Sequence, residues 1–271
     1  MCSSDLPAAA LKDPNKKEDY NDLAEAAANY VNSSHAERYS NYFYINGRAD
    51  IVRVVSDGVT DETMRKTDVE VEVLDHKTGQ MKRGKLNVSL KVGPVKQFGQ
   101  VGGTDYTSMS KLWGYFGINI EPLENHYRAA WQQNPSSALA TLYEHISNFV
   151  NKELAGDDDK KEYDFIKHLA KAINYFATLE DPTVSLVQLK TKGKYVVLRF
   201  NALEPLLKQI DLESAYISNK TMPEIVIRDA NTSKILITIR AKNEFKEDGS
   251  SYIRNLIEKG PLLEEVASVT K

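Results

Sequence analysis

Two short stretches of strict polar and apolar alternation constrain this chain more than any other feature. From Thr67 to Leu74, valines alternate with acids, and from Leu86 to Val92, apolar residues alternate with polar ones. Side chains along a strand point to opposite faces in turn, so this pattern predicts two half-buried β-strands. Thr78-Gly79 lies between the strands and Gly93-Pro94 follows the second, which together predict an antiparallel hairpin.

Charge is divided unevenly across this hairpin. The segment from Asp57 to Asp75 is rich in acids, whereas the segment from His76 to Thr104 contains bases and no acid. An acidic strand beside a basic one predicts a carboxylate cluster for a metal ion next to a surface that binds phosphate. A charge-complementary, exposed hairpin fits the same pattern and is the alternative interpretation.

The position of the turn decides which residues face each other across the hairpin. A turn centred on Thr78-Gly79 places Asp68 opposite Ser89, and a turn centred on Gly79-Gln80 places Asp68 opposite Lys91. In either register, one face of the hairpin collects the same four residues: Asp68, Glu70, Ser89 and Lys91.

The first strand reads Lys66-Thr67-Asp68-Val69-Glu70-Val71, and the second reads Val88-Ser89-Leu90-Lys91-Val92-Gly93. Together they resemble the core of the PD-(D/E)XK nucleases, in the variant where serine replaces the acid of the E-x-K element. This variant resembles certain type II restriction endonucleases and phage proteins. The resemblance covers residues 66–110. It implies a mixed α/β fold with a restriction-endonuclease-like core, in which helices flank a central mixed sheet.

The resemblance also implies a role for each residue. Asp68 is expected to be the main ligand of Mg²⁺, with Mn²⁺ as a substitute, while Leu90 offers its backbone carbonyl oxygen and Lys91 is the catalytic ammonium. Ser89 departs from the family pattern, because a hydroxyl is a poorer metal ligand than a carboxylate. The missing charge is expected from one of three glutamates: Glu70, Glu25 or Glu37.

These features predict a metal-dependent endonuclease that hydrolyses phosphodiester bonds of DNA and is encoded by a phage or a restriction system, with a homodimer as a further expectation. DNA contacts are expected from basic and amide side chains near the second strand: Lys85, Lys96, Gln97 and Gln100. Without a second carboxylate, the alternative is a catalytically inactive nuclease-fold protein of a phage that binds nucleic acid or virion proteins. A third interpretation is an interaction module without nuclease ancestry.

The rest of the chain predicts a helical segment over residues 105–180 and a β-rich C-terminal part over 183–271. Apolar spacing predicts helices near 18–31, 105–116, 122–132, 136–154 and 160–178, with Asp105 and Ser136 as N-caps. Strands are expected at 184–190, 195–200, 224–228 and 234–240. The glycine-rich stretch Phe98–Gly103 is interpreted as turns or a loop that follows DNA.

Composition bounds the class of protein. The chain has 271 residues, 41% of them hydrophobic, which is enough to bury one sizeable core, so we expect a single globular domain over residues 7–271. Apolar runs are too short to cross a bilayer, and the single cysteine, Cys2, excludes an internal disulfide and a thiolate metal cluster. A cytoplasmic protein is therefore expected. Residues 1–6 resemble a translated sequencing adapter, so we expect them to be a non-native scar.

Overall fold

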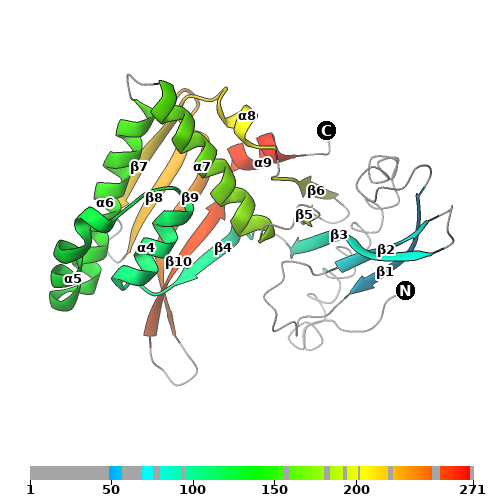
Figure 1. Ribbon diagram of the computed structural model, residues 1–271, viewed down its shortest axis with the longest axis horizontal. Helices are drawn as coiled ribbons and strands as arrows, with labels where there is room; N and C mark the ends of the chain where they lie inside the picture. The colour runs from blue at the N-terminus through cyan, green and yellow to red at the C-terminus, as the bar shows by residue number, and fades with distance from the viewer. Residues whose placement is uncertain are drawn as a thin grey trace. The chain divides into compact units, whose positions relative to one another are not determined.

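The computed structural model describes the chain in separate stretches, which are drawn as ribbons in Figure 1. The described residues are 49–56, 69–75, 80–92, 95–155, 159–179, 184–191, 194–200, 202–218, 222–245 and 251–268. They divide between two compact units. The first unit comprises the described residues up to Val95, those within Thr178–Arg199, and Ser268, and the second comprises those within Lys96–Ala177 and Phe200–Ala267.

The first unit contains a mixed sheet with the strand order β1-β2-β3-β5-β6. The alternating stretches of the sequence form β2 and β3, as expected, and β3 begins earlier than its alternation does. β3 pairs antiparallel with β2 and parallel with β5, and the two outer pairs, β1 with β2 and β5 with β6, are antiparallel. The strands are β1 (Ala49–Ser56), β2 (Val69–Asp75), β3 (Met81–Val92), β5 (Val184–Thr191) and β6 (Lys194–Leu198).

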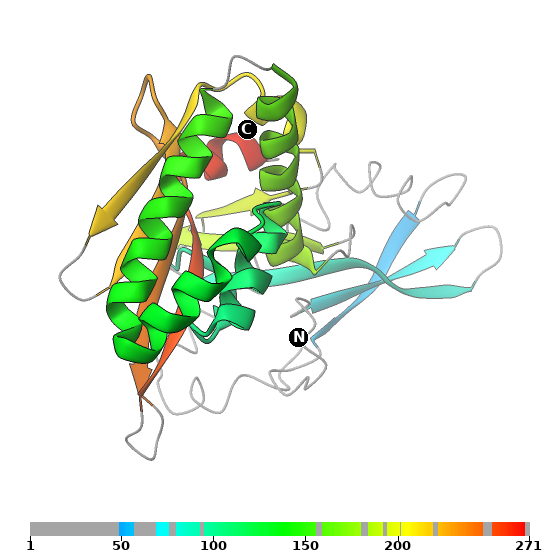
Figure 2. The same ribbon diagram turned by 60° about the vertical axis from the view of Figure 1, so that its left-hand side comes forward.

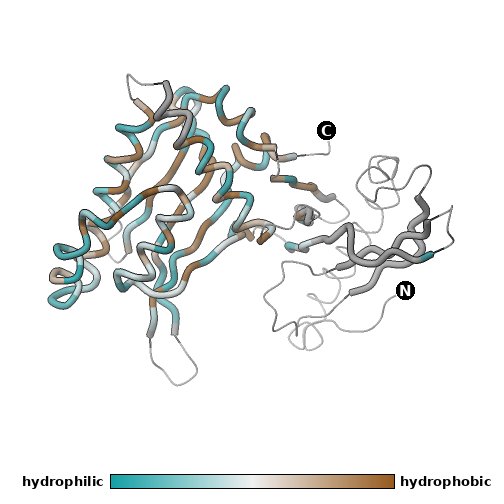
Figure 3. The backbone as a smooth tube through the Cα atoms, viewed as in Figure 1, coloured by the Kyte–Doolittle hydropathy of each residue, from teal (hydrophilic) through white to brown (hydrophobic). Residues whose placement is uncertain are grey.

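The second unit contains a fully antiparallel sheet with the strand order β4-β10-β9-β8-β7. In Figure 3, brown apolar stretches run along β8, β9 and β10, which are the central strands and supply much of the core. The strands are β4 (Gln97–Gly102), β7 (Leu212–Ser218), β8 (Pro223–Asp229), β9 (Ile235–Phe245) and β10 (Ser251–Lys259).

Helices cover one face of this second sheet (Figures 1 and 2). They are α4 (Tyr106–Tyr115), α5 (Glu124–Gln133) after a short 3₁₀ turn η1 (Glu121–Leu123), α6 (Pro135–Leu154) and α7 (Asp159–Thr178). All four expected helices of this segment are confirmed. Two short helices, α8 (Glu204–Leu207) and α9 (Pro261–Ala267), complete the unit.

Helix ends follow their capping residues. Asp105 caps α4 as expected, because its carboxylate accepts hydrogen bonds from the Ser108 backbone N–H at 3.1 Å and hydroxyl at 2.8 Å. The expected cap at Ser136 is wrong. Asn134 caps α6 instead, accepting from the Ser137 N–H at 3.1 Å, because Pro135 fits the first helical position and lets the helix start earlier.

Aromatic rings fill the core between α4, α6 and α7. Trp113 lies edge-on to Tyr143 with ring centroids 5.3 Å apart, and Phe116 stacks on Phe176 at 6.0 Å. All four are at most 4% exposed. Trp113 and Phe116 therefore belong to the helical core and offer no surface for base stacking. Tyr115 differs from them, since it is only half-buried.

The glycine-rich stretch Phe98–Gly103 was expected to form turns or a loop, but most of it belongs to strand β4. Glycine is rare in strands, yet here it allows close packing. A Cβ on Gly99 would lie 2.7 Å from Phe176 Cβ, so a side chain at that position would push α7 off the sheet. The expected helix at residues 18–31 lies outside the described residues. None of the described helices is long and apolar enough to cross a bilayer.

Candidate functional site

Strand β3 positions the two residues that the sequence singles out most strongly. Ser89 and Lys91 are two residues apart on one strand, so they belong to the same face of the sheet. Ser89 is 3% exposed, whereas Lys91 is half-buried. A buried hydroxyl therefore lies beside an ammonium-bearing side chain that solvent reaches.

The register of β2 against β3 places an acidic position on the same face. Val69 pairs with Val88 and Glu70 with Asn87, and directly paired residues of antiparallel strands share a face. Asn87, Ser89 and Lys91 alternate along β3 without a register shift against β5. Backbone positions Glu70, Ser89 and Lys91 therefore lie on one face, as the sequence predicts.

The pairing near Val69 is the register expected from a turn at Thr78-Gly79. Closer to the turn, however, Val73 pairs with Lys82 and Leu74 with Met81, so the ladder shifts between Val71 and Val73. The register at the site is therefore set by an irregularity within the hairpin, and not by the turn alone. Asp68 precedes Val69 directly in the sequence and lies outside the described residues, as do Glu25 and Glu37.

Strand β5 brings a further polar residue to this face. In the parallel ladder Ser89 pairs with Leu186 and Lys91 with Gln188. Gln188 is 1% exposed, and its amide nitrogen donates to the Val95 carbonyl oxygen at 3.1 Å. The amide thus ties β5 to the segment that follows β3. Sequence reasoning missed Gln188, because nothing local indicates that β5 lies next to β3.

No protein-family model matches the chain, and no curated protein matches it. The chemistry of the site follows from its own residues. The face holds a hydroxyl at Ser89, an ammonium at Lys91, an amide at Gln188 and a carboxylate position at Glu70.

The oxygen-bearing groups of this face are suitable ligands for a hard cation, whereas the ammonium of Lys91 is not. Oxygen atoms of carboxylates, hydroxyls and carbonyls are the ligands that Mg²⁺ prefers, and it commonly keeps several waters beside one or two protein carboxylates. No group of three His, Cys, Asp or Glu residues gathers among the residues that the structure describes. Glu70 and Glu72, two residues apart on β2, both supply acidic positions on this face.

The residues expected to contact DNA belong to different strands and connections. Lys85 lies on β3, and Lys96 is exposed just before β4. Gln97 and Gln100 lie on β4 and bond to each other at 3.0 Å from Gln97 Nε2 to Gln100 Oε1. They were expected on a loop, and that expectation is wrong, because Gly99 and Gly102 continue the strand.

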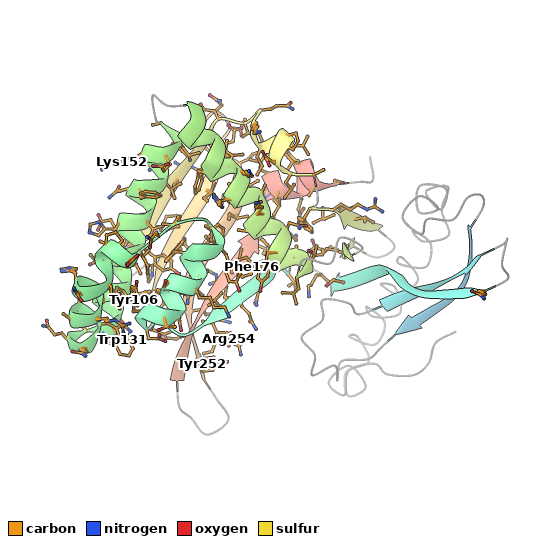
Figure 4. The ribbon with its side chains drawn as sticks, in the orientation of Figure 1. Tyr106, Trp131, Lys152, Phe176, Tyr252 and Arg254 are labelled. Carbon is orange, nitrogen blue, oxygen red and sulfur yellow. The ribbon has the colours of Figure 1, made fainter. Side chains whose placement is uncertain are left out.

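Gln100 joins a polar network with Arg254 and Tyr252 of β10, the two residues of the network that Figure 4 labels. Alternation along β10 puts both on the face opposite Asn255, which packs under the helices. Arg254 Nη1 donates to Gln100 Oε1 at 3.0 Å, and Arg254 Nε pairs with Glu244 at 3.1 Å. Tyr252 donates its hydroxyl to Glu244 at 2.9 Å. This hydrogen bond lowers the pKa of Glu244 and raises the pKa of Tyr252, because it favours the charged carboxylate and the neutral phenol.

A second network, buried under the helices, fixes the loop between β4 and α4. Asn255 is 0% exposed; it accepts from the Tyr143 hydroxyl at 2.8 Å and donates to the carbonyl oxygens of Gly103 at 2.8 Å and Val101 at 3.3 Å. Burial raises the pKa of Tyr143, so the phenol remains a neutral donor. Asn255 has a structural role.

Proposed function

We propose that this chain is a metal-dependent endonuclease that hydrolyses phosphodiester bonds of DNA, with Lys91 as its catalytic ammonium. The observation that carries the proposal is the place of Ser89 and Lys91 on β3. This strand lies between antiparallel β2 and parallel β5, and its register puts Glu70 on the same face. The mixed sheet supports a restriction-endonuclease-like core, which is the fold that the sequence resemblance implies.

Hydrolysis requires a water oxygen to form a bond to phosphorus while the ester bond to one sugar oxygen breaks and that oxygen takes up a proton. Negative charge grows on the phosphoryl oxygens in the transition state. The ammonium of Lys91 stabilises this charge and orients the attacking water. Lys91 suits the role because it is partly accessible to solvent and has no ion pair with any carboxylate among the residues that the structure describes.

The remaining residues of the face hold and shape the site. Asp68 and Glu70 are the proposed carboxylate ligands of Mg²⁺, with the Leu90 carbonyl oxygen beside them, and Glu25 or Glu37 as an added source of charge. Bound Mg²⁺ supplies neutralisation of charge on the phosphate. Gln188 is a positioning residue, because its hydrogen bond to Val95 fixes the chain just after β3.

Plasmid cleavage by the full-length protein tests the proposal. Cutting should require Mg²⁺ or Mn²⁺, stop with a chelator, and be weak or absent with Ca²⁺ although DNA is bound. Lys91→Ala should lower the rate about 100-fold or more while DNA affinity changes little, because the ammonium acts mainly on the transition state. Lys152→Ala, at an exposed lysine of α6, is the matched control and should cut normally.

The Ser89→Glu substitution distinguishes a site that binds metal weakly from a site that is catalytically inactive. The substitution restores the commoner acid of the element, but it places a carboxylate where the native side chain is 3% exposed, so the metal-free variant should be less stable. If the site lacks only one carboxylate, Mg²⁺ should raise the melting temperature of this variant more than that of the native protein. Absence of both cleavage and this metal response, in a folded protein, would favour the phage binding protein without catalysis.

A further inference from the structure

Two helices of the second unit meet through a pair of tyrosines. Tyr115 at the end of α4 stacks on Tyr175 of α7 with ring centroids 4.4 Å apart and planes 22° apart. The Tyr115 hydroxyl donates to the Tyr175 hydroxyl at 3.0 Å. Both side chains are half-buried, whereas Phe176, the neighbour of Tyr175, is 4% exposed and belongs to the core. The pair therefore presents aromatic surface to solvent.

Three basic side chains lie within two helical turns of this tyrosine pair. Lys111 lies one helical turn before Tyr115, and Lys171 lies one turn before Tyr175, so each shares a face with its tyrosine. His168 lies a further turn along α7 and its ring lies against Gly117, where an added Cβ would be 2.4 Å from His168 Cγ. Lys111, His168 and Lys171 are all exposed. We call Lys111, Tyr115, His168, Lys171 and Tyr175 the tyrosine platform.

Acids are missing from both segments that build the platform. The sequence contains no Asp or Glu from Tyr106 to Ile120 or from Phe165 to Thr178. Lys111 and Lys171 form no ion pair with any carboxylate of the described residues. Elsewhere in the same unit, basic side chains commonly pair with acids: Arg128 with Glu124, Lys208 with Glu204, Arg228 with Glu213, Lys234 with Glu265, and Arg240 with Glu258.

We propose that the tyrosine platform binds single-stranded DNA. Ammonium groups without a carboxylate partner among the described residues suit the phosphates of a nucleic-acid backbone, and a partly exposed aromatic ring suits stacking of an unpaired base. A duplex hides the faces of its bases, so stacking on the tyrosines requires an unpaired stretch. The choice of DNA as the nucleic acid rests on the proposed nuclease function, and it names the form of substrate that the protein holds.

Binding of a fluorescein-labelled oligo-dT by the full-length protein in EDTA tests the platform without any cleavage. Lys111→Gln/Lys171→Gln should weaken binding about tenfold at low salt. It should also reduce the steepness of the salt dependence by about 1.4, since each lost phosphate contact on a single strand contributes about 0.7. Lys152→Gln/Lys208→Gln, which removes two lysines elsewhere in the second unit, is the matched control and should bind within about twofold of the native protein.

Tyrosine variants test stacking separately from charge. Tyr175→Leu should weaken oligo-dT binding about tenfold, whereas Tyr175→Phe keeps the ring and should bind nearly as the native protein does. Circular dichroism checks that both variants fold. A duplex of the same length should bind more weakly and should not distinguish the two variants. Equal loss in the two lysine pairs, or duplex binding as tight as that of oligo-dT, would overturn the proposal.

The same measurement on Lys91→Ala distinguishes this proposal from the proposed catalysis. Oligo-dT affinity should be unchanged in this variant, because Lys91 belongs to the first unit and is not part of the platform. If the native protein cleaves no DNA but shows the platform-dependent binding, the nuclease proposal fails and the platform stands. If it cleaves DNA and the lysine and tyrosine variants bind normally, the platform fails alone.

Discussion

The two sheets hold their polar residues in different ways. On β10 of the second unit, Asn255 has three hydrogen-bond partners, and Lys259, which is 4% exposed, pairs with Glu264. On β3 of the first unit, Lys91 is half-buried and has no such carboxylate partner within the described part of the chain. Polar groups that are satisfied inside the protein stabilise a fold, and an available ammonium can act on a ligand.

The connection between β10 and α9 shows how the second unit uses a buried lysine. Residues 258–263 read Glu-Lys-Gly-Pro-Leu-Leu. Gly260 leaves no room for a side chain, Pro261 starts α9 at a position that needs no N–H donor, and Leu262 and Leu263 are buried. The segment joins β10 to α9, and its buried lysine, Lys259, has a structural role. A lysine beside a glycine at the end of a strand does not by itself mark an active site.

The largest expected effect is on the backbone of the second unit. A Cβ on Gly260 would lie 2.0 Å from the Ile235 carbonyl oxygen, so Gly260→Ala must displace main chain and should lower the free energy of unfolding by about 3–5 kcal/mol. Gly114→Ala is the matched control, because a Cβ there meets nothing within 4 Å. This helical position should gain about 0.5–1 kcal/mol. Urea denaturation measures both, and equal tolerance would contradict the close packing.

The next effect compares the two lysines directly. Lys259→Met should destabilise the fold by about 2–4 kcal/mol, because it removes the ion pair between the buried Lys259 ammonium and the Glu264 carboxylate. Because the Glu264 side chain is 24% exposed, water can solvate its carboxylate, which keeps the expected loss of stability towards the lower end of this range. Lys91→Met should change stability by about 0.5 kcal/mol or less and abolish cleavage. Thermal melting and plasmid cleavage are measured on both variants. A larger loss of melting temperature in Lys91→Met than in Lys259→Met would contradict this assignment of roles.

A smaller effect is expected at Asn255. Asn255→Leu removes a donor to two carbonyl oxygens and the acceptor of the Tyr143 hydroxyl, so it should cost about 1–3 kcal/mol. Hydrogen exchange should rise first at Gly103 and its neighbours, whose loop this amide fixes. Exchange that rises uniformly across the second unit would show that Asn255 stabilises the whole unit rather than the loop.

The smallest effect is a pH dependence on the exposed face of the second sheet. The folded-state pKa of Glu244 is depressed, chiefly by the Tyr252 hydroxyl, so its stabilisation is present above the ordinary carboxyl pKa and is lost as the pH falls through the folded value. Tyr252→Phe should therefore lower the melting temperature slightly at pH 7, and by less as the pH falls through the folded-state pKa of Glu244. NMR titration should show a higher pKa for Glu244 in the variant.

Local patterns predicted much of the fold. Alternation identified β2 and β3, and apolar spacing identified α4 to α7, because those elements have one buried and one exposed side. Strand β10 was missed because Asn255, Leu256 and Ile257 are all buried, so no alternation marks it. Strands β1 and β7 were also missed. β4 was missed because glycine is depleted from strands, and here close packing overrides that preference.

The sequence predicted only the part of the candidate site that lies on the β2–β3 hairpin. Ser89 and Lys91 follow from alternation along β3, and the face of Glu70 follows from pairing with β2. Gln188 comes from a strand far away in sequence, and a parallel neighbour leaves no local signal. The tyrosine platform was missed in the same way, since Tyr115 and Tyr175 belong to different helices.

The parallel pairing of β3 with β5 also determines when the proposed site is completed during synthesis. Residues 93–183 separate the two strands, so Lys91 leaves the ribosome long before Gln188 does. At ~5–20 residues per second, this delay is about 5–20 seconds. Throughout this time the nascent chain lacks the neighbour that completes the sheet around Ser89. For the proposed nuclease, the order of the chain delays completion of the site, because every helix from α4 to α7 must be translated before β5 can pair with β3.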